Sequence, residues 1–342
     1  MLRALLVTAL ALAAAPASAS AAVELVTPGA DAVSGAASVS GSGRYVAFAS
    51  EASTLVPGDT NGASDVFVRD RLTGTTTRVS GGAGPSGAPS ISGDGRIVAF
   101  ASRSPDLVPG DVNGRGLDVY VHDRATGVTR RLAPGAGLYQ SFDPSVSAEG
   151  GHVAFAAERV QRGEEKGDLV EAGPRRVYVA VLSSGAVGRA SVTSREHGAS
   201  DSSFEPAMAA GGGHVAFTSR ASDLAAGDDD LASDVYVRDL RRGRTRRVSR
   251  GSAGTSLTSW ATAPSISADG DLVAFQLSST DLVEEGGGPV GQVMVRKRTA
   301  RATWVPEARR SGFPALSGDG RIVAFTSART GRAEIYADGP LR

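Results

Sequence analysis

The chain has 342 residues, in which 36 lysines and arginines balance 36 aspartates and glutamates, and it contains no cysteine. The balanced charge argues against a protein that binds nucleic acid, and the lack of cysteine excludes disulfides, thiolate metal sites and cysteine nucleophiles. A chain of this length can bury a core large enough to fold without disulfides.

Residues 1–21 have the pattern of a secretory signal peptide. Arg3 supplies a positive charge, residues 5–15 form a short apolar stretch, and Ala19 and Ala21 are candidate cleavage positions. The apolar stretch is too short to span a bilayer, and we expect no membrane span later in the chain. The sequence therefore predicts a secreted or periplasmic protein whose mature domain covers residues 22–342.

A Val-Ala-Phe phrase then returns six times along the chain. The six copies place phenylalanine at Phe48, Phe100, Phe155, Phe217, Phe275 and Phe325. Their separations lie between 50 residues (Phe275 to Phe325) and 62 residues (Phe155 to Phe217). A period of this size indicates one supersecondary unit that is copied side by side.

The second copy shows the expected unit most clearly. Pro89 stands at the entry of its first strand, where the missing N–H removes no ladder hydrogen bond, and Asp94-Gly95 is a hairpin signal. We expect four strands, at residues 88–92, 96–102, 118–123 and 128–133. Four antiparallel strands in one repeat are typical of a blade of a β-propeller.

The last copy stops soon after residues 334–336, before a fourth strand could form. Residues 23–29 precede the first copy and resemble the fourth-strand segments at residues 77–81 and 246–251. We therefore expect residues 23–27 to complete the last blade, because closure of the ring removes an exposed sheet edge. The predicted fold class is all-β, a six-bladed β-propeller closed by an N-terminal strand.

Two motifs identify a resemblance to a known group of proteins. They are Ser-Ile-Ser-Gly-Asp-Gly-Arg-Ile-Val-Ala-Phe-Ala-Ser at residues 90–102 and Asp-Val-Tyr-Val-His-Asp-Arg-Ala-Thr-Gly at residues 118–127. They resemble the repeat of the TolB-like six-bladed propellers and of the wider group of exported WD-like repeat proteins. The resemblance covers essentially all of the mature chain and implies the same propeller fold.

The long loops between the second and third strands are candidate cation sites. They carry oxygen-rich side chains at alternate positions and a glycine at the bend, which suits a hard cation such as calcium. The candidate ligands are Asp59, Asn61, Asp65, Asp111, Asn113, Asp118, Asp228, Asp230 and Asp234. The alternative is a purely structural loop held by Asx turns, and we expect no cofactor other than calcium.

A second candidate site lies where the connectors between blades reach the expected central channel. Asp143 and Glu205 each precede the first-strand proline in neighbouring blades, and two carboxylates so placed can serve as acid and base in glycoside chemistry. The other copies have Ala36, Ala88, Ala263 and Phe313 at this position. The full set of candidate ligand-binding residues is Tyr139, Phe142, Asp143, Phe204, Glu205 and Trp260. The alternative for the aromatic residues is that each ring packs onto its own blade.

These features predict an exported, non-catalytic binding or scaffold module, expected to be a monomer, for a protein, a peptide or an envelope glycan. The alternative is a carbohydrate- or lactone-active enzyme with its site at the mouth of the channel. No serine stands in a nucleophile-elbow setting, and the four histidines have no convincing catalytic partner. Both observations favour the binding module.

Overall fold

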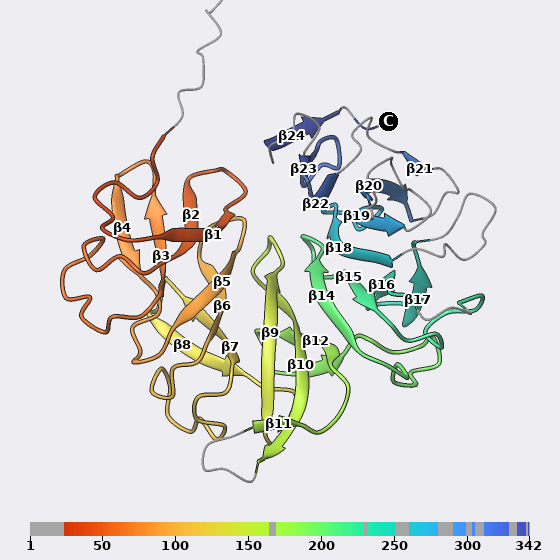
Figure 1. Cartoon of the computed structure of the whole chain (residues 1–342), viewed down its shortest axis with the longest axis horizontal. Helices are drawn as coiled ribbons and strands as arrows, with labels where there is room; N and C mark the ends of the chain where they lie inside the picture. Colours follow the sequence, from red (N-terminus) through yellow and green to blue (C-terminus); the bar gives the residue numbers. More distant parts are fainter. Residues whose placement is uncertain are drawn as a thin grey trace, which may run out of the picture.

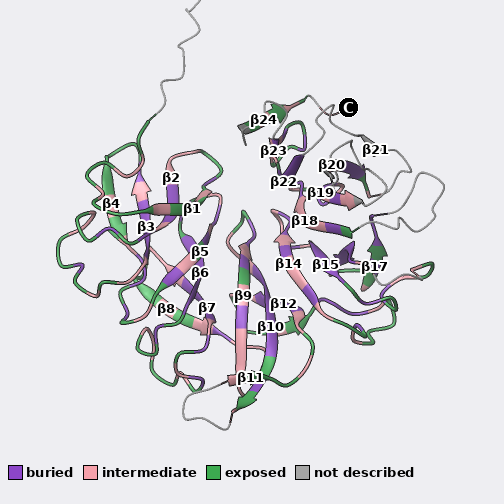
Figure 2. Ribbon diagram, in the orientation of Figure 1, coloured by how far each residue is buried: buried purple, intermediate pink, exposed green. Residues whose placement is uncertain are grey.

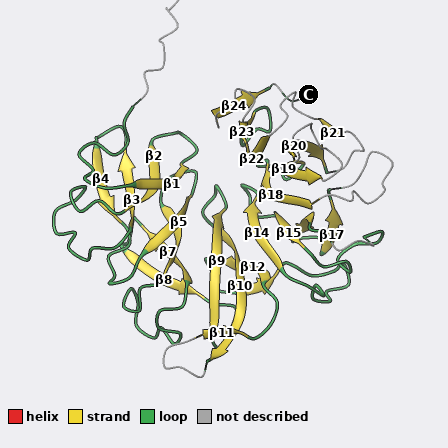
Figure 3. Ribbon diagram, in the orientation of Figure 1, coloured by secondary structure: helices red, strands yellow, loops and turns green. Residues whose placement is uncertain are grey.

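The computed structural model describes residues 24–163, 169–228, 232–249, 260–279, 290–298, 303–304, 311–327, 334–339 and 341. These residues form six antiparallel sheets placed as blades around a common centre (Figure 1). Strands and loops make up the described part of the chain (Figure 3), and none of it forms a helix that could cross a bilayer. The expected signal peptide lies outside the described residues.

The chain builds the blades in order, and each blade runs from an innermost strand outward. Blade 1 contains β1 (Ser34–Val39), β2 (Tyr45–Ser50), β3 (Asp65–Asp70) and β4 (Thr75–Arg78). Blade 2 contains β5 (Ser86–Ile91), β6 (Ile97–Ser102), β7 (Asp118–Asp123) and β8 (Val128–Leu132). Blade 3 contains β9 (Tyr139–Val146), β10 (His152–Arg162), β11 (Leu169–Glu171), β12 (Arg176–Val181) and β13 (Val187–Arg189).

The remaining three blades follow the same plan. Blade 4 contains β14 (Ser203–Met208), β15 (His214–Ser219), β16 (Asp234–Asp239) and β17 (Arg244–Arg247). Blade 5 contains β18 (Trp260–Ile266), β19 (Leu272–Ser279), β20 (Val290–Lys297) and β21 (Thr303–Trp304). Blade 6 contains β22 (Ser311–Leu316), β23 (Val323–Ser327) and β24 (Glu334–Asp338). The predicted six-bladed β-propeller is confirmed.

The Val-Ala-Phe phrase forms the second strand of every blade. All six residues of β6 are buried, because neighbouring blades cover both faces of each sheet (Figure 2). Phe100 lies directly opposite Tyr120 on β7, and their rings stack with centroids 5.8 Å apart. Four other blades repeat this aromatic pair, which adds about 0.5–1.5 kcal/mol to the hydrophobic contribution of each pair.

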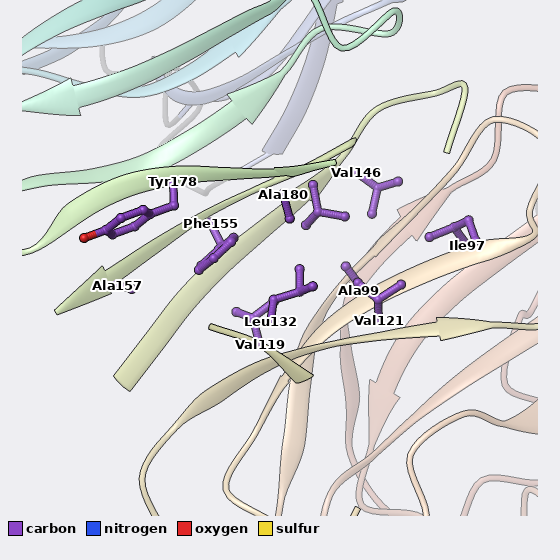
Figure 4. Packing of buried hydrophobic residues seen from close by; sticks show 11 residues of the cluster. Ile97, Ala99, Val119, Val121, Leu132, Val146, Phe155, Ala157, Tyr178 and Ala180 are labelled. Carbon is purple, nitrogen blue, oxygen red and sulfur yellow. The ribbon is translucent and has the colours of Figure 1, made fainter. Parts of the chain in front are cut away.

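Adjacent blades pack through these buried faces. Between blades 2 and 3, Val119 and Val121 of β7 lie in one cluster with Phe155 of β10 and Val146 of β9 (Figure 4). Burial of each such side chain contributes about 1.5–3 kcal/mol. Serine hydroxyls also join the innermost strands: Ser90 Oγ accepts a hydrogen bond from the backbone N–H of Val146 (3.0 Å).

The prediction that residues 23–27 close the ring is wrong for the described residues 24–27. These residues form no strand, and Glu24 instead pairs with Arg71 of blade 1 at 2.8 Å. The carboxylate of Asp31 accepts hydrogen bonds from Ser53 and Thr54, so polar contacts hold the N-terminal segment against blade 1. Val23 lies outside the described residues.

The last sheet accordingly has three strands among the described residues. Ile335 of β24 is 80% exposed, whereas the residues at its position in the other five blades are fully buried. These five residues are Val66, Val119, Val177, Val235 and Val293. Val39 of β1, on the opposite side of the opening, is 57% exposed. Among the described residues, blades 1 and 6 therefore form the two ends of an open ring (Figure 1).

Candidate functional site

Each innermost strand contains a bulge, and in blades 2 to 6 the first bulge residue directly precedes a proline. In blade 2, β5 begins at Ser86, and the register shifts between Gly87 and Ser90, so Pro89 lies inside the strand and not at its entry. The first bulge residue is left-handed in all six blades, with φ between 46° and 51°: Ala36, Ala88, Asp143, Glu205, Ala263 and Phe313. A non-glycine residue in this conformation costs roughly 1–3 kcal/mol, and such strain concentrates at ligand-binding positions.

The structure brings Asp143 and Glu205 together at the bulges of β9 and β14. Glu205 Oε2 accepts hydrogen bonds from the backbone N–H of Ala263 (2.8 Å) and from Oγ1 of Thr218 (3.0 Å). The backbone amide of Glu205 in turn stabilises the Asp143 carboxylate. Each carboxylate therefore holds the bulge of the next blade, so both groups have a structural use.

The pKa of Asp143 is raised, mainly because the surrounding protein desolvates its carboxyl group. The negative charge of Glu205 acts in the same direction, and the nearby guanidinium of Arg175 opposes it. The same guanidinium lies over the Phe142 ring, with Cζ 3.9 Å from the ring centroid, and pairs with Glu158 at 3.2 Å. Arg175 thus connects the aromatic and acidic members of the predicted site.

The other predicted aromatic residues differ in their surroundings. Tyr139 packs against the hydrophobic cluster between blades 2 and 3, and Phe204 lies beneath the guanidinium of Arg220 at 5.8 Å. Trp260, the first residue of β18, is 62% exposed. Phe313, which was not among the predicted site residues, is 74% exposed at the bulge of β22. Its alignment with Asp143 and Glu205 was the signal that could have identified it.

The acidic loops have an unpredicted component, an arginine from the fourth strand. In blade 1, Arg78 Nη1 lies 2.7 Å from Asp59 Oδ1 and 3.3 Å from Asp65 Oδ2. Blades 2 and 4 repeat the arrangement with Arg131 between Asp111 and Asp118, and with Arg247 between Asp228 and Asp234. The three arginines occupy equivalent positions, opposite the aromatic residue of the third strand.

Asn61 and Asp111 supply the Asx turns that the structural interpretation expects. Asn61 Oδ1 accepts a hydrogen bond from the N–H of Ala63 (3.0 Å), and its Nδ2 donates to Asp65 Oδ2 (2.9 Å). In blade 2 the N–H of Asn113 donates to Asp111 Oδ1 (3.0 Å). The loops are therefore built from their own side chains.

Burial raises the pKa of several carboxyl groups in these loops. Desolvation raises the pKa of Asp118 to about 6 and that of Asp234 to about 6, although Arg131 and Arg247 oppose the shift. It also raises the pKa of Asp65, where the hydroxyl of Ser80 opposes it. The arginines thus compensate only part of the cost of burying these charges.

The guanidinium groups supply the positive charge that a calcium ion would bring, and a cation would have to displace them. No group of three or more histidine, cysteine, aspartate or glutamate side chains that could hold a metal ion occurs within the described ranges. The arginine contacts and the Asx turns match the structural interpretation, and in blade 2 Asp111 Oδ2 and Asn113 Oδ1 are buried without a hydrogen-bond partner among the described residues. Asp230 lies outside the described residues.

No protein-family model and no curated protein sequence matches the chain. The β-propeller domain of the Trilobed protease from Pyrococcus furiosus, which has an open velcro topology, matches with a TM-score of 0.56 and 10% identity over 91% of this chain and 82% of that chain. Oligogalacturonate lyase in complex with manganese matches with a TM-score of 0.57 and 11% identity over 88% of this chain and 72% of that chain. These two likenesses establish the propeller fold alone.

TolB from Acinetobacter baumannii is also matched, with a TM-score of 0.48 and 17% identity over 81% of this chain. This chain spans 57% of the length of that TolB. The six-bladed propeller that the sequence resemblance implies is present in the structure itself.

Proposed function

We propose that this propeller is an exported, non-catalytic binding or scaffold module for a protein or peptide partner. The observation that carries the proposal is the use of Asp143 and Glu205 as structural acceptors. Glu205 is hydrogen-bonded to Ala263 and Thr218, and Asp143 is held by the amide of Glu205. Glu205 Oε2 has a structural role in the bulge of the next blade, and we propose the same role for the carboxyl group of Asp143, which belongs to an exposed residue.

The partner surface that we propose is centred on Trp260 and Phe313. These rings belong to the innermost strands of blades 5 and 6, and both are mostly exposed. Exposure of large aromatic side chains to water is unfavourable. Such side chains are enriched among the residues that contribute most of the binding energy at protein interfaces. We propose a peptide as the partner, because an apolar peptide side chain can bury these rings without needing a polar partner of its own.

Affinity capture from an exported-protein fraction tests this proposal. The wild type should retain a defined partner, and Trp260→Ala combined with Phe313→Ala should lose it while keeping the melting temperature of the wild type. The matched control is Leu72→Ala combined with Val128→Ala, which removes exposed apolar groups from the outer part of blades 1 and 2. Partner retention by the Trp260 and Phe313 variant would refute the proposed surface, and recovery of a glycan instead of a protein would refute the proposed partner class.

A carbohydrate- or lactone-active enzyme is the second candidate. The raised pKa of Asp143, beside the second carboxyl group of Glu205, is the observation that favours it, because glycoside chemistry uses one protonated and one ionised carboxyl group. Hydrolysis that depends on these two residues would distinguish this candidate from the binding module.

A further inference from the structure

A groove at the periphery between blades 4 and 5 is lined by arginine. It lies along β17, the outermost strand of blade 4, and beside the end of β20 in blade 5 (Figure 1). Its cavity has a volume of about 350 Å³ and is lined by Val237, Asp239, Arg242, Arg244, Arg246 and Arg298. We call it the arginine groove. Its lining contains four guanidinium groups and one carboxylate.

Two of the four arginines are anchored, and the other two have no hydrogen-bond or ion-pair partner among the residues that the structure describes. Arg298 Nε donates to the carbonyl of Gly270 (2.9 Å), and Arg242 pairs with Asp239 at 3.1 Å. Arg244 and Arg246 occupy alternate positions of β17, are exposed, and make no side-chain hydrogen bond or ion pair with any residue that the structure describes. Alternate residues of a strand point to the same face, so their positive charges add in one place.

The repeat provides an internal comparison for this groove. The corresponding groove between blades 2 and 3 is also a cavity, and the four positions equivalent to the arginines are Thr126, Val128, Arg130 and Leu182. Between blades 1 and 2 the four positions are Thr73, Thr75, Thr77 and Arg124. Between blades 3 and 4 they are Ser184, Ala186, Gly188 and Leu240.

Among these four described grooves, the one between blades 4 and 5 alone has arginine at every position. Protection of an outer edge strand by charge would act on each blade, so it does not account for four arginines at one groove. The groove between blades 2 and 3 also balances its charges, because Arg96 pairs with Asp123 at 2.7 Å. The arginine groove therefore has an excess of positive charge that the equivalent grooves lack. The propeller fold does not require arginine at these positions.

We propose that the arginine groove binds a tetrahedral oxyanion, a phosphate or a sulfate group. A guanidinium group forms paired hydrogen bonds with such oxygens, and several guanidinium groups match an anion with three terminal oxygens and two negative charges. A carboxylate has two oxygens and one charge, so a single arginine satisfies it. This site lies outside the ring centre and does not depend on the partner surface at Trp260 and Phe313.

Calorimetric titration of the full chain with inorganic phosphate, sulfate, glycerol 3-phosphate and acetate, at constant ionic strength, tests the proposal. We expect saturable binding of phosphate or sulfate at one site and no comparable binding of acetate. Arg244→Gln combined with Arg246→Gln should weaken that binding at least tenfold. Tighter binding of glycerol 3-phosphate than of inorganic phosphate would identify an esterified ligand, and the reverse order a free anion.

The matched control is Arg159→Gln combined with Arg162→Gln. It removes the same charge from exposed positions on β10 of blade 3, which do not line the groove, and it should change the affinity less than twofold. An equal loss in both double variants, or acetate binding as tight as phosphate binding, would show general charge attraction and overturn the proposal. Unchanged affinity in Arg244→Gln with Arg246→Gln would also overturn it.

The pKa of His214 provides a second measure of anion binding that is independent of calorimetry. Its Nε2 lies 3.6 Å from Asp239 Oδ2, and its pKa is lowered by burial and by the charges of Arg298 and Arg242, with Asp239 opposing. A bound dianion should offset those positive charges and raise the pKa of His214 in an NMR titration. An unchanged pKa of His214 at saturating phosphate would place the anion elsewhere and overturn the assignment to this groove.

Discussion

Replacing Arg247 with methionine tests whether arginine holds the acidic loops together. The Arg247 side chain is fully buried, and its Nη1 lies 2.9 Å from Asp234 Oδ2 and 3.2 Å from Asp228 Oδ1. Both carboxylate side chains are 3% exposed, so water cannot replace the lost partner. Breaking a buried ion pair by removing one member costs about 3–5 kcal/mol, and we expect the free energy of unfolding at pH 7 to fall by that amount.

Urea denaturation measures this loss, and methionine keeps most of the side-chain volume. Arg78→Met is the comparison variant, because Arg78 is 24% exposed and water can reach part of its site, so its loss should be smaller. A triple variant with Asp228→Asn, Asp234→Asn and Arg247→Met should recover most of the stability, since it buries no unpaired charge. A loss below about 1 kcal/mol for Arg247→Met, the size of a surface pair, would refute the reasoning.

Three further predictions concern the buried acids, the loops and the open ring. The pKa values of Asp118 and Asp234 rise to about 6 in the folded state from 3.8, so the stability these protonated groups contribute is present at low pH and is lost as the pH rises through about 6. Asp234→Asn should therefore gain stability relative to the wild type between pH 4 and pH 7 in urea denaturation, and the opposite trend would contradict the assignment. Millimolar calcium should leave the melting temperature unchanged, because arginine side chains occupy the acidic loops. If calcium instead raises the melting temperature, and Asp59→Ala combined with Asp111→Ala abolishes the increase, the loops are a cation site. Deletion of residues 22–28 should cost less than about 2 kcal/mol, since the described part of this segment pairs with no strand, and a much larger loss would show that it closes the ring.

The sequence predicted the architecture because the repeat carries its own pattern. A tight turn with a left-handed glycine, a buried Val-Ala-Phe strand and a third strand recur in this order in every blade, and each is a local signal. At Gly95, φ is +76° and a Cβ atom would lie 2.1 Å from Tyr45, so the turn and the contact between blades depend on the same residue. Local signals of this kind report on long-range packing when every blade repeats them.

The features that the sequence did not predict depend on contacts between distant residues. Arg78 is 19 residues away from Asp59 along the chain, and neither position alone indicates an ion pair. The left-handed conformation of Asp143 contradicts the usual preference of a residue before proline for extended backbone. The N-terminal segment resembled a fourth strand, yet polar contacts of Glu24 and Asp31 hold it against blade 1.

The most direct test of a binding module is an assay for turnover. The purified wild type should release no product from a panel of glycans and lactones, and Asp143→Asn and Glu205→Gln should lower only the melting temperature, because both carboxylates hold bulges of the innermost strands. The account would be contradicted if the wild type formed product and either variant lost this activity while keeping the wild-type melting temperature. That result would establish an enzyme.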